Sequence, residues 1–120
     1  MKKILYVEDD AINALVMKQI LKKRYEVVQV GDAESCLLLL EQEKFDLVLM
    51  DIHLGNGKMD GIQAMKEIKK KISGDLMPVI AVTSYALPED EDKFLADGFD
   101  GYLSKPIEKE VLFEYLLRYL

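Results

Sequence analysis

Five short apolar segments alternate with five longer segments of helical character, and this alternation constrains the fold more than any other feature of the sequence. The predicted strands are rich in β-branched residues and span residues 3–7, 26–30, 47–50, 79–83 and 101–104. The predicted helices span residues 11–24, 33–43, 61–71, 88–97 and 107–120. Parallel strands need a crossover connection, which is usually a helix. The pattern therefore predicts an α/β fold in which helices cover both faces of a parallel sheet.

The short connections leave few arrangements for such a sheet. Crossovers are nearly always right-handed, and the common order for five strands is the flavodoxin-like 2-1-3-4-5. We therefore expect a doubly wound, three-layer sandwich, with residues 1–120 forming one domain. In this order a crevice opens beside the carboxyl ends of the first and third strands, where a ligand is expected to bind.

Local signals agree with these helix boundaries. Asp32 is suited to cap the second helix, and Asp10 the first. Pro88 fits the first position of the fourth helix, and the acidic run 89–92 fits the positive end of its dipole. Gly98 is a suitable stop for that helix.

Composition excludes several functions. The net charge of −6 opposes direct binding to nucleic acid or to anionic membranes, which carry charge of the same sign. No apolar run approaches the length needed to cross a bilayer, so we expect a cytoplasmic protein. Cys36 is the only cysteine, which rules out an intramolecular disulfide and a cysteine-based zinc site. We interpret it as a small buried hydrophobe on a helix.

Polar residues follow or end four of the predicted strands. Glu8, Asp9 and Asp10 follow the first strand, Asp51 follows the third, Thr83 and Ser84 end the fourth, and Lys105 follows the fifth. The carboxyl ends of parallel strands meet at one edge of the sheet. We therefore expect these side chains to surround one pocket.

Carboxylates that share a small pocket repel one another unless a cation or a shared proton relieves them. Hard oxygen ligands favour Mg²⁺, with Mn²⁺ as a second candidate, over zinc. The ammonium of Lys105 and the hydroxyl of Thr83 complete the set of groups that phosphoryl transfer to a carboxylate requires. The alternative is that these residues have only structural roles, in which Asp9 and Asp10 cap the first helix and Asp51 lies in a turn. That alternative suits Asp10 but leaves the alignment of four strand ends unexplained.

Five segments in register resemble the response-regulator receiver domain of two-component phosphorelays. In chain order they are residues 4–10 (ILYVEDD), 49–52 (LMDI), 59–61 (MDG), 81–84 (AVTS) and 101–106 (GYLSKP). Each segment alone is a weak signal, but together they span essentially the whole chain at suitable spacing.

The resemblance implies that Asp51 accepts a phosphoryl group from a phosphohistidine. The donor would be a sensor histidine kinase or a histidine phosphotransfer protein. The resemblance also implies a Mg²⁺ site in which Asp9 binds the ion directly and Glu8 largely through water. Asp51 and the backbone carbonyl of His53 would complete the protein ligands.

The same resemblance implies a switch. Lys105 would pair with one phosphoryl oxygen and Thr83 would hydrogen-bond another. Tyr102 would follow Thr83 between exposed and inward positions, which changes the surface offered to a downstream protein effector. The family also has a cis peptide bond at the position of Lys105–Pro106.

The sequence departs from the family pattern after Asp51. Residues 54–59 (LGNGKM) replace a short loop with a proline, and are about two residues longer. Gly55 and Met59 bound the variable part of this loop, which we expect to affect partner contacts and dephosphorylation. His53 and Tyr85 flank the expected phosphoryl entrance. The side chain of His53 is either solvated or, in a sharper reading, catalytic or metal-binding.

Two helices carry more apolar residues than one buried stripe needs. On the first helix we predict that the apolar residues are mostly core, with a subset that docks a phosphohistidine-bearing helix; they are Ile12, Leu15, Val16 and Ile20. On the last helix the core explains about half of the apolar residues, which are Val111, Leu112, Phe113, Tyr115, Leu116, Leu117 and Tyr119. The others would form a homodimer or effector surface.

Other function classes fit less well. A magnesium-dependent phosphohydrolase also forms an aspartyl phosphate, but typically has a second aspartate where this chain has His53, and a cap insertion that this chain lacks. A receiver that serves only for docking would not need the complete set of acid, hydroxyl and lysine. A flavin- or nucleotide-binding protein would need a glycine- or serine-rich phosphate loop after the first strand. We therefore predict a non-enzymatic phospho-acceptor with slow self-dephosphorylation.

Overall fold

The computed structural model describes residues 1–55, 59–71, 77–84 and 89–120, and there it shows the predicted alternation of strands and helices. The strands in these ranges are β1 Lys3–Val7, β2 Glu26–Val30, β3 Leu47–Asp51, β4 Val79–Thr83 and β5 Gly101–Ser104. The helices in them are α1 Ala11–Leu21, α2 Ala33–Gln42, α3 Gly61–Lys71, α4 Asp90–Asp97 and α5 Lys109–Leu116. The roles predicted for Tyr85, Pro88 and the central part of the loop after Asp51 lie outside the described residues.

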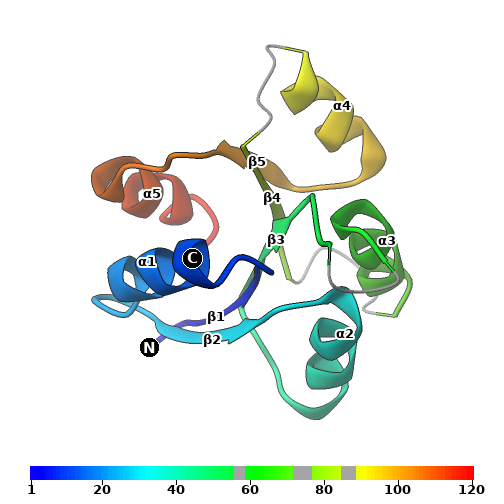
Figure 1. Ribbon diagram of the computed structural model, residues 1–120, viewed down its shortest axis with the longest axis horizontal. Coiled ribbons are helices and arrows are strands. Elements are labelled where there is room, and N and C mark those ends of the chain that lie inside the picture. Colours follow the sequence, from blue (N-terminus) through cyan, green and yellow to red (C-terminus); the bar gives the residue numbers. More distant parts are fainter. Residues whose placement is uncertain (56–58, 72–76, 85–88) are drawn as a thin grey trace.

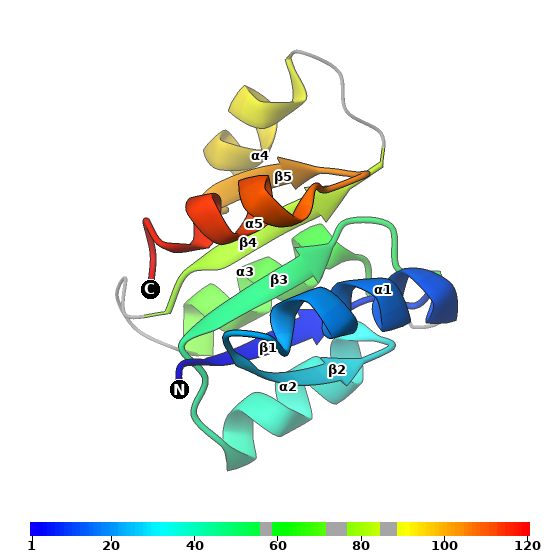
Figure 2. The same ribbon diagram turned by 90° about the vertical axis from the view of Figure 1, so that its left-hand side faces the viewer.

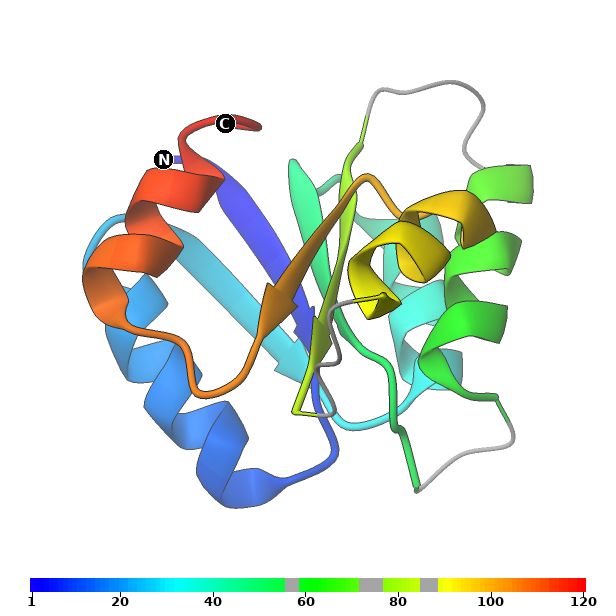
Figure 3. The ribbon, with the colours of Figure 1, turned by 90° about the horizontal axis from the view of Figure 1, so that it is seen from above.

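The strands form one parallel sheet in the order β2-β1-β3-β4-β5, which confirms the predicted topology. Helices α1 and α5 cover one face, and α2, α3 and α4 cover the other (Figures 1 and 3). All strand arrows point toward the same edge of the sheet (Figure 2). Residues that follow different strands are therefore gathered at this edge.

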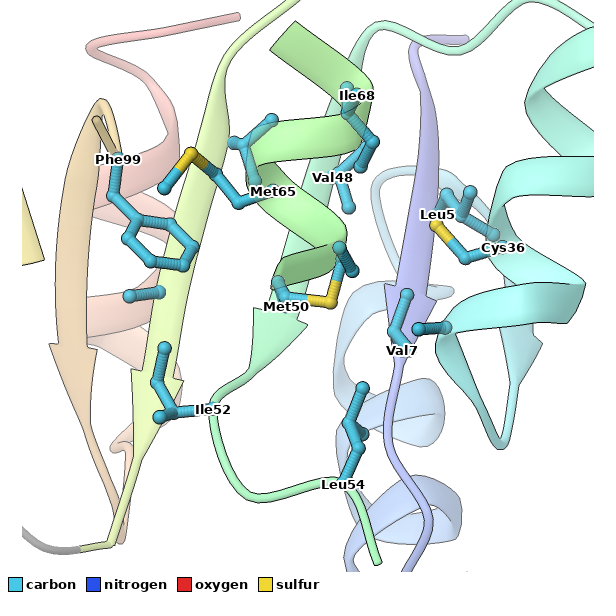
Figure 4. Close-up of a cluster of buried hydrophobic side chains, with 14 of the residues drawn as sticks. Leu5, Val7, Cys36, Val48, Met50, Ile52, Leu54, Met65, Ile68 and Phe99 are labelled. Atoms are coloured by element: carbon cyan, nitrogen blue, oxygen red, sulfur yellow. The ribbon is translucent and has the colours of Figure 1, made fainter. Parts of the chain in front are cut away.

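Both faces of the sheet are buried in apolar contacts. Alternate residues of a strand point to opposite faces, so Leu5 and Val7 pack beneath α2 and α3 while Ile4 and Tyr6 pack beneath α1 and α5. In the first of these two clusters, α3 contributes Met65 above the central strands (Figure 4). Central strands of a parallel sheet read as continuous apolar runs for this reason.

The predicted caps are confirmed. The Asp10 carboxylate accepts hydrogen bonds of 2.9 Å from the N–H groups of Ile12 and Asn13, and Asp32 accepts one of 2.7 Å from Ser35. Gly98 ends α4 with a positive φ of 126°, which glycine adopts without the strain that a side chain would add. These local bonds fix where the helices leave the carboxyl edge of the sheet.

Helices α1 and α5 end well before the predicted positions. Helix α1 ends at Leu21 instead of residue 24, because the N–H groups of Lys23 and Arg24 bond to carbonyls three residues back and so tighten the chain into a turn. Helix α5 spans only Lys109–Leu116, and similar bonds follow its last turn. None of the helices in the described ranges is long and apolar enough to cross a membrane.

The prediction that the apolar residues of α1 are mostly core is wrong. Ile12, Leu15 and Val16 are 75%, 58% and 55% exposed. The buried stripe of α1 consists instead of Ala14, Met17 and Leu21. Sheet contact selects one of two apolar faces of this helix, and the other remains on the surface.

Cys36 is fully buried on α2, as predicted. Burial raises the pKa of its thiol to about 12, with the charge of Asp32 acting in the same direction. The thiol therefore stays protonated at neutral pH and behaves as an apolar core group.

Candidate functional site

Three carboxylates meet at the carboxyl edge of the sheet. Glu8 and Asp9 follow β1, Asp51 ends β3, and the pairing of Val7 with Met50 sets these strand ends side by side. One oxygen from each carboxylate lies within 4.8 Å of the others. Glu8 is 1% exposed and Asp51 is 5% exposed. The sequence-predicted acidic cluster is thus assembled and largely buried.

Lys105 reaches this cluster from the end of β5. Its backbone N–H donates to the carbonyl of Thr83 at 2.8 Å, which anchors the residue beside the end of β4. Its ammonium forms an ion pair with Oε1 of Glu8 and lies 3.6 Å from Oδ2 of Asp51. The Lys105–Pro106 peptide bond is cis, as the sequence resemblance implied. One cation therefore serves two buried carboxylates.

The two buried carboxyl groups differ in their affinity for protons. Burial raises the pKa of Asp51 to about 7, and the neighbouring Glu8 acts in the same direction, against Lys105 and the N–H of His53. Burial also raises the pKa of Glu8, but hydrogen bonding to Asp51 and Lys105 outweighs burial and holds this pKa below its usual value. In the absence of a metal ion, Glu8 is therefore the charged partner of Lys105, and Asp51 is the group that holds a proton near neutrality.

Backbone N–H groups from the loop after β3 also bind the site carboxylates. The N–H of His53 donates to Oδ1 of Asp51 at 3.1 Å, and the N–H of Gly55 donates to Oδ2 of Asp9 at 2.8 Å. At the other end of the loop, the N–H of Met59 donates to Oε1 of Glu34 at 3.2 Å. The loop is thus attached to the acidic cluster on one side and to α2 on the other.

An open cleft of about 610 Å³ adjoins Asp9 and the loop. Its lining includes His53 and Gly55 from the loop, Asp60 before α3, and Lys93 from α4. The side chain of His53 is exposed, which agrees with the solvated reading of this residue. Of the three clustered carboxylates, Asp9 lines this cleft, so a charged group can approach the cluster from this side.

The two predicted switch residues lie on neighbouring strands. Thr83 is fully buried at the end of β4, paired in register with Ser104. Tyr102 is half-buried in β5, and its ring stacks on Phe94 of α4 with centroids 5.7 Å apart. Its hydroxyl is buried and has no hydrogen-bond partner among the described residues. The movement of Tyr102 with Thr83 stays a prediction.

Sequence reasoning missed one polar side chain near the site, Tyr6. The hydroxyl of Tyr6 donates to Oε1 of Glu8 at 3.0 Å from within β1. The only signal in the sequence is the spacing of two residues, which places Tyr6 and Glu8 on the same side of the strand. The bond from Gly55 to Asp9 was missed as well, because any residue type supplies a backbone N–H.

The chemistry of the donor set fits magnesium. The three carboxylates offer hard oxygen ligands, and Lys105 alone does not balance their charge. Mg²⁺ binds through a few carboxylates and keeps several of its waters, which suits a small cluster beside an open cleft.

The family model of the response regulator receiver domain matches residues 4–117. The chain belongs to this family. The polar-differentiation response regulator DivK from Brucella anthropi is 31% identical over 120 residues, which cover 99% of the chain and 96% of DivK. The signal transduction histidine-protein kinase BarA from Escherichia coli is 36% identical over 117 residues, which cover 97% of the chain. The chain spans only 12% of the length of BarA.

Solved receiver domains have the same fold. The receiver domain of sensor histidine kinase PA1611 from Pseudomonas aeruginosa superimposes with a TM-score of 0.87 at 34% identity, covering 98% of this chain and 96% of that one. That structure contains a magnesium ion coordinated in the active-site cleft. The chemotaxis protein CheY4 from Vibrio cholerae has a TM-score of 0.88 at 26% identity, covering 100% and 99%.

Family membership places this receiver domain in phosphorelay signalling. Receiver domains are phospho-acceptors rather than turnover enzymes, and they bind Mg²⁺ in an acidic site and work with histidine kinases and phosphotransfer proteins. These properties argue against the phosphohydrolase and flavin-binding alternatives.

Proposed function

We propose that this receiver domain is phosphorylated on Asp51 by a phosphohistidine of a sensor histidine kinase or phosphotransfer protein. The observation that carries the proposal is the position of Asp51, buried beside two other carboxylates with the Lys105 ammonium 3.6 Å from its Oδ2. A carboxylate oxygen of Asp51 attacks phosphorus, the P–N bond breaks, and its electron pair leaves with the imidazole. Lys105 is placed to neutralise charge on the transferred group.

We propose that Mg²⁺ binds at the same site, and Mn²⁺ would fit the same donors. Asp9 and Asp51 are the direct carboxylate ligands, Glu8 acts through water, and the backbone carbonyl of His53 completes the protein ligands. The ion would supply positive charge for the phosphoryl oxygens. The 4.8 Å cluster of carboxylate oxygens and the magnesium in the PA1611 receiver domain support this assignment.

The output is a changed surface read by a downstream protein effector. Thr83 would hydrogen-bond the phosphoryl group, and Tyr102 would change position with it. The Tyr102 hydroxyl has no hydrogen-bond partner within the part of the chain that the structure describes, which supports this role because such a group gains from any position in which it finds a partner. Val111 on α5 and Leu117 directly after it are 50% and 66% exposed and offer an apolar surface for the effector or for a second copy.

The exposed residues of α1 are the proposed docking site for the phosphohistidine-bearing helix. Ile12, Leu15 and Val16 form an apolar surface on this helix. Beside it lies a groove of about 470 Å³ that extends from Val16 to Lys105. A helix bound here would bring its histidine toward the carboxyl edge of the sheet.

The proposal is tested with acetyl phosphate and Mg²⁺, using intact mass to detect an acyl phosphate. We expect a phosphoryl adduct on the wild-type protein and none on Asp51→Asn, with slow loss of the adduct after the donor is removed. An unmodified wild-type protein, or an equal adduct on Asp51→Asn, would favour a docking receiver. Continuous phosphate release from phosphomonoesters would favour a phosphohydrolase.

A further inference from the structure

The Tyr6 hydroxyl is a buried hydrogen-bond donor aimed at a carboxylate of the proposed site. Tyr6 is fully buried in β1 and donates to Oε1 of Glu8 at 3.0 Å. The Lys105 ammonium bonds to the same oxygen, and Oε2 accepts from the N–H of Asp10 at 3.3 Å. Burial, together with the charge of Glu8, raises the pKa of Tyr6, so the hydroxyl keeps its proton. Oε1 of Glu8 thus has two donors that come from opposite ends of the chain.

The hydrogen bond from Tyr6 matters because, in the proposed function, Lys105 also binds the phosphoryl group on Asp51. Its ammonium lies 3.6 Å from Asp51 and would turn toward a phosphoryl oxygen once Asp51 is modified. Without Tyr6, the departure of Lys105 would leave Oε1 of Glu8 with no side-chain donor from the described part of the chain, at a position that is 1% exposed. A buried charged acceptor without a partner is costly. Tyr6, held in the central part of the sheet, remains on this oxygen.

We infer that Tyr6 is a positioning residue that keeps Glu8 hydrogen-bonded when Lys105 transfers from Glu8 to the phosphoryl group on Asp51. This inference rests on the proposed function. Tyr6 does not touch the phosphoryl group; it lowers the free-energy difference between the two positions of Lys105. The alternative is that Tyr6 is a core residue whose hydroxyl merely finds a nearby acceptor.

The variant Tyr6→Phe separates these alternatives because it removes only the hydroxyl. Calorimetric titration would measure binding of Mg²⁺ alone and then of beryllofluoride, a phosphoryl mimic, at saturating Mg²⁺. Lys105 remains on Glu8 in the first titration, so we expect the Mg²⁺ dissociation constant to change by less than ~3-fold. It leaves Glu8 in the second, so we expect beryllofluoride affinity to fall by ~10-fold.

Two further variants make the test specific. Tyr25 is also a buried tyrosine on the α1 and α5 face of the sheet, but it packs on Phe113, and Tyr25→Phe should leave beryllofluoride affinity unchanged. In a Lys105→Met background no lysine leaves Glu8, so adding Tyr6→Phe should weaken beryllofluoride binding by no more than ~2-fold.

Equal beryllofluoride affinity in Tyr6→Phe and wild type would overturn the inference and leave the proposed function standing. An equal loss with and without Lys105 would overturn it too, because Tyr6 would then act independently of the lysine. If the wild-type protein bound no beryllofluoride, both proposals would fall together. If Tyr6→Phe fails to fold, a crystal structure of the wild-type complex with Mg²⁺ and beryllofluoride decides. The inference requires the Lys105 ammonium to contact a fluoride while the Tyr6 hydroxyl still donates to Glu8. A Tyr6 hydroxyl turned away from Glu8 overturns it.

Discussion

Gly61 lies directly against the backbone of Asp51: a Cβ atom added to Gly61 would come within 2.2 Å of the Asp51 carbonyl oxygen. The N–H of Gly61 also donates to the carbonyl of Ile52 at 3.1 Å, so the start of α3 is fastened to the end of β3. No flexible side chain can yield here, because the atoms in conflict belong to the backbone. We expect Gly61→Ala to lower the free energy of unfolding by about 1–3 kcal/mol. Urea denaturation measures this change.

Gly31 provides the matched control for Gly61. A Cβ atom at Gly31 would meet its nearest neighbour, the carbonyl oxygen of Glu8, at 4.0 Å, which is an ordinary contact. Gly31→Ala should therefore be neutral or should stabilise the protein by up to about 1 kcal/mol, because alanine restricts the unfolded chain. Equal destabilisation by both variants would show that the close contact of Gly61 with the Asp51 backbone is not the cause.

The arrangement of the sheet and the gathering of the site residues could be predicted from the sequence. Alternating strands and helices left few topologies, and the parallel strands then carried Asp51 and Lys105 to one edge. The face of α1 could not be predicted in this way. Leu15 and Met17 are both apolar, and only contact with the sheet decides which of them is buried.

The hydrogen bonds that orient the carboxylates were beyond sequence reasoning for a different reason. Tyr6 lies in a strand buried on both faces, where polar and apolar residues do not alternate, so its ring reads simply as another core group. Only the folded backbone turns its hydroxyl toward Glu8. The N–H of Gly55 reaches Asp9 across 46 positions of sequence, and no residue type announces such a bond.

Magnesium binding should depend on pH through Asp51. In the metal-free site its pKa is about 7, raised mainly by burial and by Glu8, while Lys105 opposes the shift. Below that pH a proton must leave before the ion binds, and above it the carboxylate is already ionised. We expect Mg²⁺ affinity to rise ~10-fold between pH ~6 and pH ~8, measured by calorimetry in buffers of different ionisation enthalpy to count the released proton.

The folding stability of the metal-free protein should change in the opposite direction. A carboxyl group whose pKa is raised on folding holds its proton more tightly in the folded state than in the unfolded state. Protonated Asp51 therefore contributes to the free energy of unfolding at low pH, and this contribution is lost as pH rises from about 4 toward 7. Asp51→Asn removes the titrating group and should abolish the dependence in this window. Unchanged Mg²⁺ affinity of the wild-type protein between pH ~6 and pH ~8 would contradict the shifted pKa of Asp51.

The side chain of Asp100 joins β4 and α3 at the opposite edge of the sheet. Its Oδ2 accepts from the N–H of Val79 at 2.8 Å and from the ammonium of Lys69 on α3 at 2.5 Å. Asp100→Ala would leave the N–H of Val79 without this acceptor, and we expect it to lower the free energy of unfolding by about 1–2 kcal/mol. Lys69→Met should cost less than about 1 kcal/mol, because the ion pair is partly exposed and screened by solvent.

Urea denaturation with a surface control measures both changes. Glu114 is an exposed acidic residue of α5, and Glu114→Ala should alter the free energy of unfolding by no more than about 0.5 kcal/mol. A loss for Lys69→Met as large as that for Asp100→Ala would show that the ion pair, and not the bond to Val79, dominates this junction.

A substitution on the exposed apolar surface of α1 should impair docking of the kinase without impairing phosphorylation of Asp51 by a small phosphodonor. Leu15 on α1 is 58% exposed, and Leu38 on α2 is 60% exposed. The two helices lie on opposite faces of the sheet (Figure 3). Replacing either leucine with aspartate removes little buried area and should leave the free energy of unfolding nearly unchanged. With acetyl phosphate as donor, both variants should be phosphorylated at the wild-type rate. The second donor is an autophosphorylated histidine kinase that phosphorylates the wild-type protein. With this donor, Leu15→Asp should slow phosphoryl transfer by ~10-fold or more, because the new charge would be buried against the partner helix. Leu38→Asp should leave the rate of transfer from the kinase unchanged. Rapid-quench measurement of radiolabelled phosphate distinguishes these outcomes, and equal transfer rates for the two variants would place the kinase on another surface.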